Sequence, residues 1–145
     1  MSSKVKRVFL GALALSTSVA IGVVGLGGAT ATASAKSHTI KFTAIATSLS
    51  TPTQSGAFYE SYVAVSSQST TDGVLSCVAS ASSWTCDAAG ADATGILDSH
   101  FTLSLTTGAL TGTVTGGTGA YADATGTVSG KEVALGEKIT VVYTT

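Results

Sequence analysis

The stretch GGTGAYA, residues 116–122, contains a Gly-x-Gly-x-x-Ala pattern that is typical of a nucleotide-binding loop. Such a loop must follow a strand and open a helix, whose N-terminus holds the pyrophosphate. The residues that follow, YADATGTVSG, are too rich in glycine and β-branched side chains to form that helix. We therefore interpret Gly116, Gly117 and Gly119 as turn residues, and we expect Tyr121 to pack back under the turn.

Glu60 and Tyr62 are the two weak candidates for a catalytic role. They lie in the segment AFYESYVAV, residues 57–65, where side chains alternate between two faces. If Phe58, Glu60 and Tyr62 share the inward face, Glu60 is a buried carboxylate with a raised pKa. The alternation equally allows Tyr59 and Ser61 to point inward. Glu60 would then lie on a solvated face, as a lone glutamate more often does.

Cys77 and Cys86 are the only cysteines of the chain. In an exported protein an isolated pair is most simply a disulfide, and the hairpin sequence around SASS would bring the two together. They cannot form a zinc motif with His38 and His100, because the spacing is wrong. The acidic residues lack the spacing of a calcium loop. We expect no metal and no cofactor.

The first 35 residues have the pattern of a secretory signal peptide. Lys4, Lys6 and Arg7 precede an apolar run over residues 8–26, and Ala33-x-Ala35 offers the small residues that signal peptidase needs. We therefore expect cleavage after Ala35, a mature domain over residues 36–145, and a secreted, extracellular protein without membrane attachment. The alternative is a retained anchor, because the apolar run is long enough to span a bilayer.

The charge of residues 36–145 restricts the partners. This part of the chain carries four lysines, no arginine and all eight acidic residues. A nucleic-acid partner requires a basic face that releases counterions, and an anionic membrane surface requires the same. We therefore expect neither nucleic acid nor membrane as a partner.

Residues 36–145 read as an all-β domain. Short alternating segments such as KITVVYT recur at intervals of 8–12 residues and are separated by glycine-rich turns. In the segment SHFTLSLT, Phe101, Leu103 and Leu105 would face the core and His100 would face outward. This pattern indicates a sandwich or a barrel. A barrel is favoured because closure removes the exposed strand edges that so few charges cannot protect.

The glycine segment also carries a family resemblance. LTGTVTGGTGAYADATGTVSG resembles the Gly-Gly-Thr-Gly-x-Tyr-x-x-x-x-Gly segment of the allene oxide cyclase and dirigent β-barrel superfamily, most of all its exported actinobacterial members. Gly116, Gly117, Gly119, Tyr121 and Gly126 match this motif. The resemblance implies an eight-stranded antiparallel barrel, an interior that can hold one apolar ligand and, by analogy with plant members, a trimer.

Three functions are compatible with this resemblance. The first, which we expect, is binding of a small apolar molecule inside the barrel without catalysis. The second is a dirigent- or cyclase-like enzyme that steers ring closure or coupling of an apolar substrate. The third is a structural or interaction protein of the cell surface. The residues expected to line the cavity are Phe58, Glu60, Tyr62, Phe101, Leu103 and Tyr121.

Overall fold

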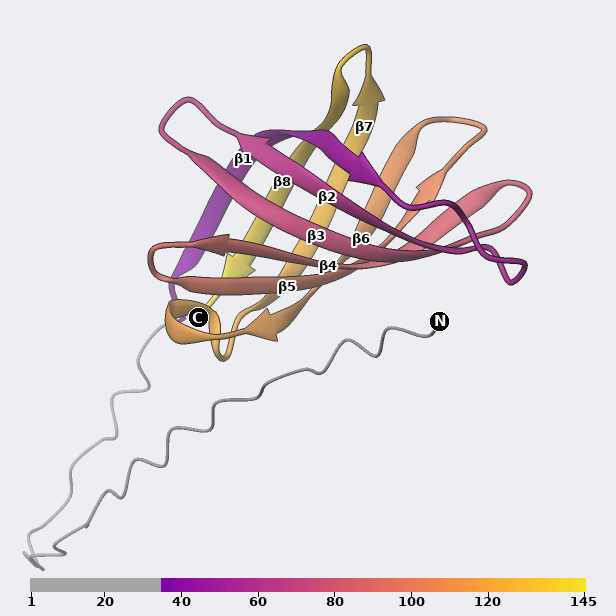
Figure 1. Ribbon diagram of the computed structural model, residues 1–145. Coiled ribbons are helices and arrows are strands. Elements are labelled where there is room, and N and C mark those ends of the chain that lie inside the picture. Colours follow the sequence, from indigo (N-terminus) through magenta and orange to yellow (C-terminus); the bar gives the residue numbers. More distant parts are fainter. Residues whose placement is uncertain (1–34) are drawn as a thin grey trace, which may run out of the picture. The chain divides into compact units, whose positions relative to one another are not determined.

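Alternating side chains build eight strands in the computed structural model, which describes residues 35–145. The strands are β1 (Ser37–Leu49), β2 (Ala57–Val65), β3 (Thr70–Ala79), β4 (Ser83–Asp92), β5 (Gly95–Ser104), β6 (Ala109–Gly117), β7 (Thr125–Val133) and β8 (Gly136–Thr144). Each strand pairs antiparallel with the next, and β8 pairs with β1, so the sheet closes into a barrel (Figure 1). The expected eight-stranded antiparallel barrel is confirmed.

The expected signal segment lies outside the described residues, apart from Ala35. Within residues 35–145, no helix has the length and apolar character that a membrane span requires. The barrel and its disulfide are compatible with an extracellular protein.

The burial of the β2 side chains shows which face of this strand is inward. Phe58 and Tyr62 are buried, whereas Tyr59 between them is 65% exposed. Glu60 is on the same face as Phe58 and Tyr62 and is half-buried. The register places Glu60 beside Leu75 of β3, whose side chain also packs against the core. The interpretation in which Glu60 points away into water does not describe this structure.

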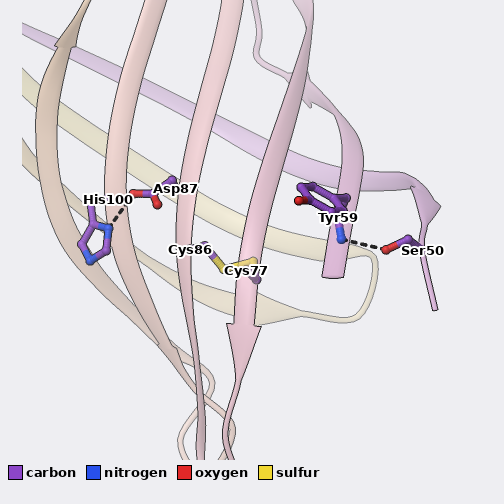
Figure 2. Close-up of a disulfide and its surroundings, with 6 residues drawn as sticks. All are labelled: Ser50, Tyr59, Cys77, Cys86, Asp87 and His100. Atoms are coloured by element: carbon purple, nitrogen blue, oxygen red, sulfur yellow. Dashed lines mark hydrogen bonds and ion pairs between the residues drawn. A yellow bond between two sulfur atoms is a disulfide. The ribbon is translucent and has the colours of Figure 1, made fainter. Parts of the chain in front are cut away.

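The two cysteines lie opposite each other on β3 and β4, and they form the expected disulfide (Figure 2). Both are almost completely buried and belong to the main hydrophobic core. The ring that the bond closes is short, so loop-closure entropy gives a stabilisation of about 2.5–3 kcal/mol. The bond fixes the register of the hairpin that carries Trp84.

Gly73 leaves room for the ring of Tyr62 inside the barrel. Gly73 of β3 is directly opposite Tyr62 of β2, and the Tyr62 ring lies where a side chain of residue 73 would be. A Cβ added at Gly73 would overlap the ring carbons of Tyr62. Because Gly73 has no side chain, the ring of Tyr62 can extend over β3. The ring fills interior space that smaller side chains would leave empty.

The glycine loop between β6 and β7 closes the barrel end at which the C-terminus lies (Figure 1). It contains one short 3-10 helix, Gly119–Tyr121, and then enters β7, so it does not open the long helix of a nucleotide site. Gly119 has a φ of +59°, and a Cβ there would overlap the carbonyl oxygen of Thr94. The turn interpretation is the one that the structure shows.

Tyr121 connects this loop to the β4–β5 turn. Its hydroxyl donates a 2.6 Å hydrogen bond to Oδ2 of Asp92, whose Oδ1 accepts hydrogen bonds from the backbone N–H groups of Thr94 and Gly95. Partial burial acts to raise the pKa of Asp92, but these hydrogen bonds outweigh it and lower that pKa. Burial and the bond to Asp92 raise the pKa of Tyr121 to about 12.

Replacing Gly73 with alanine tests the close approach of Tyr62. We expect Gly73→Ala to lower the free energy of unfolding by about 1–3 kcal/mol, because the ring must move out of its packed position. Urea denaturation followed by circular dichroism measures the loss. Gly90→Ala is the matched control, since a Cβ there would lie 3.4 Å from the Tyr62 hydroxyl oxygen, which is ordinary contact. Equal losses in the two variants would contradict the explanation.

Replacing Tyr121 with phenylalanine tests the link between the two turns. We expect Tyr121→Phe to lose about 1 kcal/mol of unfolding free energy at pH 7. A carboxyl pKa that folding lowers stabilises the protein above the unfolded-state value and ceases to do so as the pH falls through the folded-state value. The difference from the parent protein should therefore shrink below pH about 4. Tyr59→Phe, on the exposed outer face, should show neither effect in the same urea titrations.

Candidate functional site

Two carboxylates lie at one end of the barrel interior, on either side of β1. Glu60 comes from β2 and is opposite Leu49 of β1, while Glu137 comes from β8 and is opposite Ala44 of β1. Both side chains are half-buried, and both line the same internal cavity. We call this end of the barrel, marked by Glu60 and Glu137, the acidic mouth.

Below the acidic mouth the interior holds two small cavities. The upper cavity, of about 60 Å³, begins at Glu60 and Glu137 and is walled mainly by apolar side chains, including Leu75, Trp84 and Phe101. The lower cavity, of about 120 Å³, reaches towards the glycine loop. Four residues line both cavities and stand at their boundary: Phe42, Tyr62, Ser99 and Val141.

The surroundings of the two carboxylates favour their neutral forms. Burial raises the pKa of Glu60, and the negative charge of Glu137 raises it further. Burial likewise raises the pKa of Glu137, and the charge of Glu132 adds to this, although a backbone hydrogen bond acts in the opposite direction. The mouth can therefore hold protons that ordinary surface carboxyls would lose, and it resists holding two negative charges at once.

Tyr62 brings a hydroxyl group to the boundary between the cavities. Its side chain is only 8% exposed, and none of the hydrogen bonds found within residues 35–145 involves its hydroxyl. Burial, and then the charge of Glu60, raise the pKa of Tyr62. The hydroxyl is thus a neutral donor and acceptor that is available to a molecule in the interior.

The structure distributes the expected cavity residues unevenly. Glu60, Tyr62, Phe101 and Leu103 line the upper cavity, and Tyr62 and Tyr121 line the lower one. Phe58 lines neither cavity. Its ring is buried and packs edge-on against Trp84, with 4.8 Å between the ring centroids.

The outer wall of the barrel carries a wider hollow of about 630 Å³, which runs across β2 to β5. Tyr59, Val74 and Asp87 are among its lining residues. His100, expected to face outward, is on this outer face, and its Nδ1 lies 2.7 Å from Oδ1 of Asp87 (Figure 2). The hollow is open to solvent, and it shares the half-buried Glu60 with the upper cavity. Its other acidic side chains, Asp87 and Asp98, are not enclosed by apolar walls, so we place the candidate site in the interior.

Two residues of the site were not among the sequence-based candidates. Glu137 is one step before the alternating residues Ile139, Val141 and Tyr143, so extending that alternation backwards would have placed it inward. Trp84 precedes Cys86 by two residues and shares its inward face. In both cases the signal was the period of two along the strand.

No group of three or more histidine, cysteine, aspartate or glutamate side chains in the described part of the chain is arranged to hold a metal ion. The arrangement that remains is an apolar upper cavity with the carboxyls of Glu60 and Glu137 and the phenol of Tyr62, above a more polar lower cavity that Asp92 and Tyr121 also line. Such a site can bind a small organic molecule and can exchange a proton with it.

Comparison with known proteins identifies the architecture and not the family. No protein-family model matches the chain, and no curated protein matches it. Among solved structures, a protein described as pyocyanin demethylase has a similar fold, with a TM-score of 0.60 and 18% sequence identity. The similarity covers 73% of this chain and 99% of that protein. At this level of identity the likeness shows the barrel fold alone.

The raised pKa of Glu60 gives a prediction for stability. A carboxyl whose pKa rises on folding favours the folded state below the unfolded-state value, and this advantage is lost as the pH rises through the folded-state value. Glutamine at position 60 does not titrate, so the variant does not lose this stability as the pH rises. We therefore expect the unfolding free energy of Glu60→Gln to increase relative to that of the parent protein between pH 4 and pH 7. Urea titrations at the two pH values measure the change.

Asp72→Asn, on the exposed outer face of β3, is the control and should show no such gain. The interpretation would be wrong if Glu60→Gln lost stability relative to the parent protein between pH 4 and pH 7.

Proposed function

We propose that the mature chain is an exported β-barrel protein that binds one small apolar molecule in the barrel interior. The observation that carries this proposal is the pair of cavities below the acidic mouth, of which the upper is mainly apolar. The residues at their boundary are Phe42, Tyr62, Ser99 and Val141. A cavity of about 150 Å³ is large enough for benzene. Neither cavity reaches this volume alone, but the two together exceed it. A single-ring compound that spans the boundary between them is therefore the size class that we expect.

Several features support binding over a purely structural role. Protein interiors are usually close-packed. Here the interior retains empty volume beside the Tyr62 hydroxyl, for which no hydrogen bond is found within residues 35–145. The resemblance of the glycine segment to allene oxide cyclase and dirigent barrels is consistent with a ligand in this place, and with a trimer.

A catalytic role is the second candidate, and the two carboxyls favour it. A glutamate with a raised pKa can donate a proton at neutral pH and accept it again, which is what general acid–base catalysis requires. The similar structure described as pyocyanin demethylase carries an enzyme's name. Under this proposal Glu60 is the proton donor, Tyr62 orients the substrate, and the apolar wall holds it in one conformation.

Filling the upper cavity tests the binding proposal. Ala88 is buried and lines this cavity, and Ala88→Val would occupy part of its volume. We expect the variant to lose binding of toluene, measured by the fluorescence of Trp84, which is the only tryptophan of the chain. Ala89→Val, one residue further on the opposite face of β4, is the matched control and should bind as the parent does. If Ala89→Val lost toluene binding while Ala88→Val kept it, the interior site would be refuted.

Native mass spectrometry of protein from the culture medium of the producing organism tests the other parts of the proposal. The expected mass corresponds to cleavage after Ala35 with two hydrogens lost at Cys77 and Cys86. The assembly mass reports whether the protein is a trimer. A retained small molecule would identify the chemical class of the ligand, whereas an uncleaved precursor in the cell fraction would contradict export.

A further inference from the structure

The carboxylates of the acidic mouth form no ion pair with a basic side chain of residues 35–145. The ion pair found in residues 35–145 joins His100 to Asp87 on the outer face, and none involves Glu60 or Glu137. Burial makes both side chains costly to ionise, and the charge of Glu137 adds to the cost at Glu60. A positive charge from outside the chain would remove that cost.

The basic residues of the domain are placed where they cannot supply that charge. Lys36 is exposed before β1, and Lys41, Lys131 and Lys138 are exposed on the outward faces of their strands. His38 stacks on Tyr143, with 5.1 Å between the ring centroids, near the opposite end of the barrel. The field at the mouth is therefore set by acids alone, and clefts lined by one sign of charge concentrate ligands of the other sign.

The walls below the carboxylates suit an organic cation. Trp84 and Phe101 line the upper cavity, and Phe42 and Tyr62 line it at the boundary with the lower cavity. Aromatic faces attract ammonium groups, and the attraction grows when the pair is shielded from water. Tyr62, whose side chain is only 8% exposed and whose hydroxyl makes no hydrogen bond found within residues 35–145, lines the same cavity and can hydrogen-bond to a polar substituent of the ligand.

We propose that the ligand of this barrel is a small organic cation, such as an aryl- or alkylammonium ion, whose charge is held between Glu60 and Glu137 and whose apolar part enters the aromatic-lined cavity. This inference rests on the interior binding site proposed above and names the class of molecule that the site takes. A divalent metal ion fits less well, because it needs about six oxygen ligands and the remaining wall is apolar.

Three single-ring probes of nearly equal shape separate charge from size: benzylammonium, benzyl alcohol and benzoate. Binding is measured on the full mature protein by Trp84 fluorescence and by chemical-shift changes in nuclear magnetic resonance spectra. We expect benzylammonium to bind about tenfold more tightly than benzyl alcohol, and benzoate to bind most weakly. Glu60→Gln and Glu137→Gln should each remove most of the preference for the cation without changing the affinity for benzyl alcohol.

Asp72→Asn, which removes an acidic group from the outer face, is the control and should leave all three affinities unchanged. If benzyl alcohol binds as tightly as benzylammonium, the interior site stands and the inference about charge fails. If none of the three probes binds, the proposed function itself fails. A response of the mouth residues to calcium chloride, with no preference among the organic probes, would also overturn the inference in favour of a metal site.

Discussion

The pairing of β1 with β8 is the interaction on which the rest of the structure depends. It runs the length of β8, from Ser37 opposite Thr144 to Ala44 opposite Glu137. Closure removes both edges of a sheet that carries few charges to protect them. It also makes β1 the common neighbour of β2 and β8, which brings Glu60 and Glu137 to the same mouth although they lie far apart in the sequence.

Closure also gives the barrel a limited interior, and the aromatic side chains use most of it. Tyr62 extends over Gly73, and Tyr121 packs edge-on against Tyr143 near the opposite end, with 5.7 Å between the ring centroids. The empty volume that remains is divided in two at Phe42 and Tyr62. The packing that stabilises the fold thus also determines the size of the site. The polar character of the upper cavity comes mainly from Glu60, Tyr62 and Glu137.

The period of two along the strands was enough to predict an all-β domain, whereas the eight-stranded barrel was implied by the family resemblance. The period placed Phe101 and Leu103 inward and His100 outward, as the structure has them. It was wrong for Leu105, which lies in the turn after β5 and is 44% exposed. The isolated cysteines correctly predicted the disulfide, and the glycines correctly predicted a turn. The long hairpin formed by the ends of β4 and β5 was not visible, because the segment AAGADATG has small side chains on both faces and no alternation.

The site was harder to predict because its members meet only through tertiary structure. Phe58 and Tyr59 are both aromatic, so the alternation in β2 could not show which face is inward. Packing against Cys77 and Trp84 on other strands decides this. Glu137 could be placed on the inward face of its own strand, but no local pattern relates it to Glu60. That relation depends on the closure of the sheet.

The order of the strands has a consequence for how the chain folds. The first strand pairs with the second on one side, but its other partner is the last strand. During synthesis β1 therefore has one unpaired edge until β8 has been made, and the contacts that close the barrel span almost the whole domain. Such long-range pairing slows folding, because the entropy of a large loop is lost before the contacts that compensate it can form. Before β8 pairs with β1, a partly folded sheet would have two edge strands with unpaired backbone groups. We expect aggregation to compete with folding most strongly at that stage.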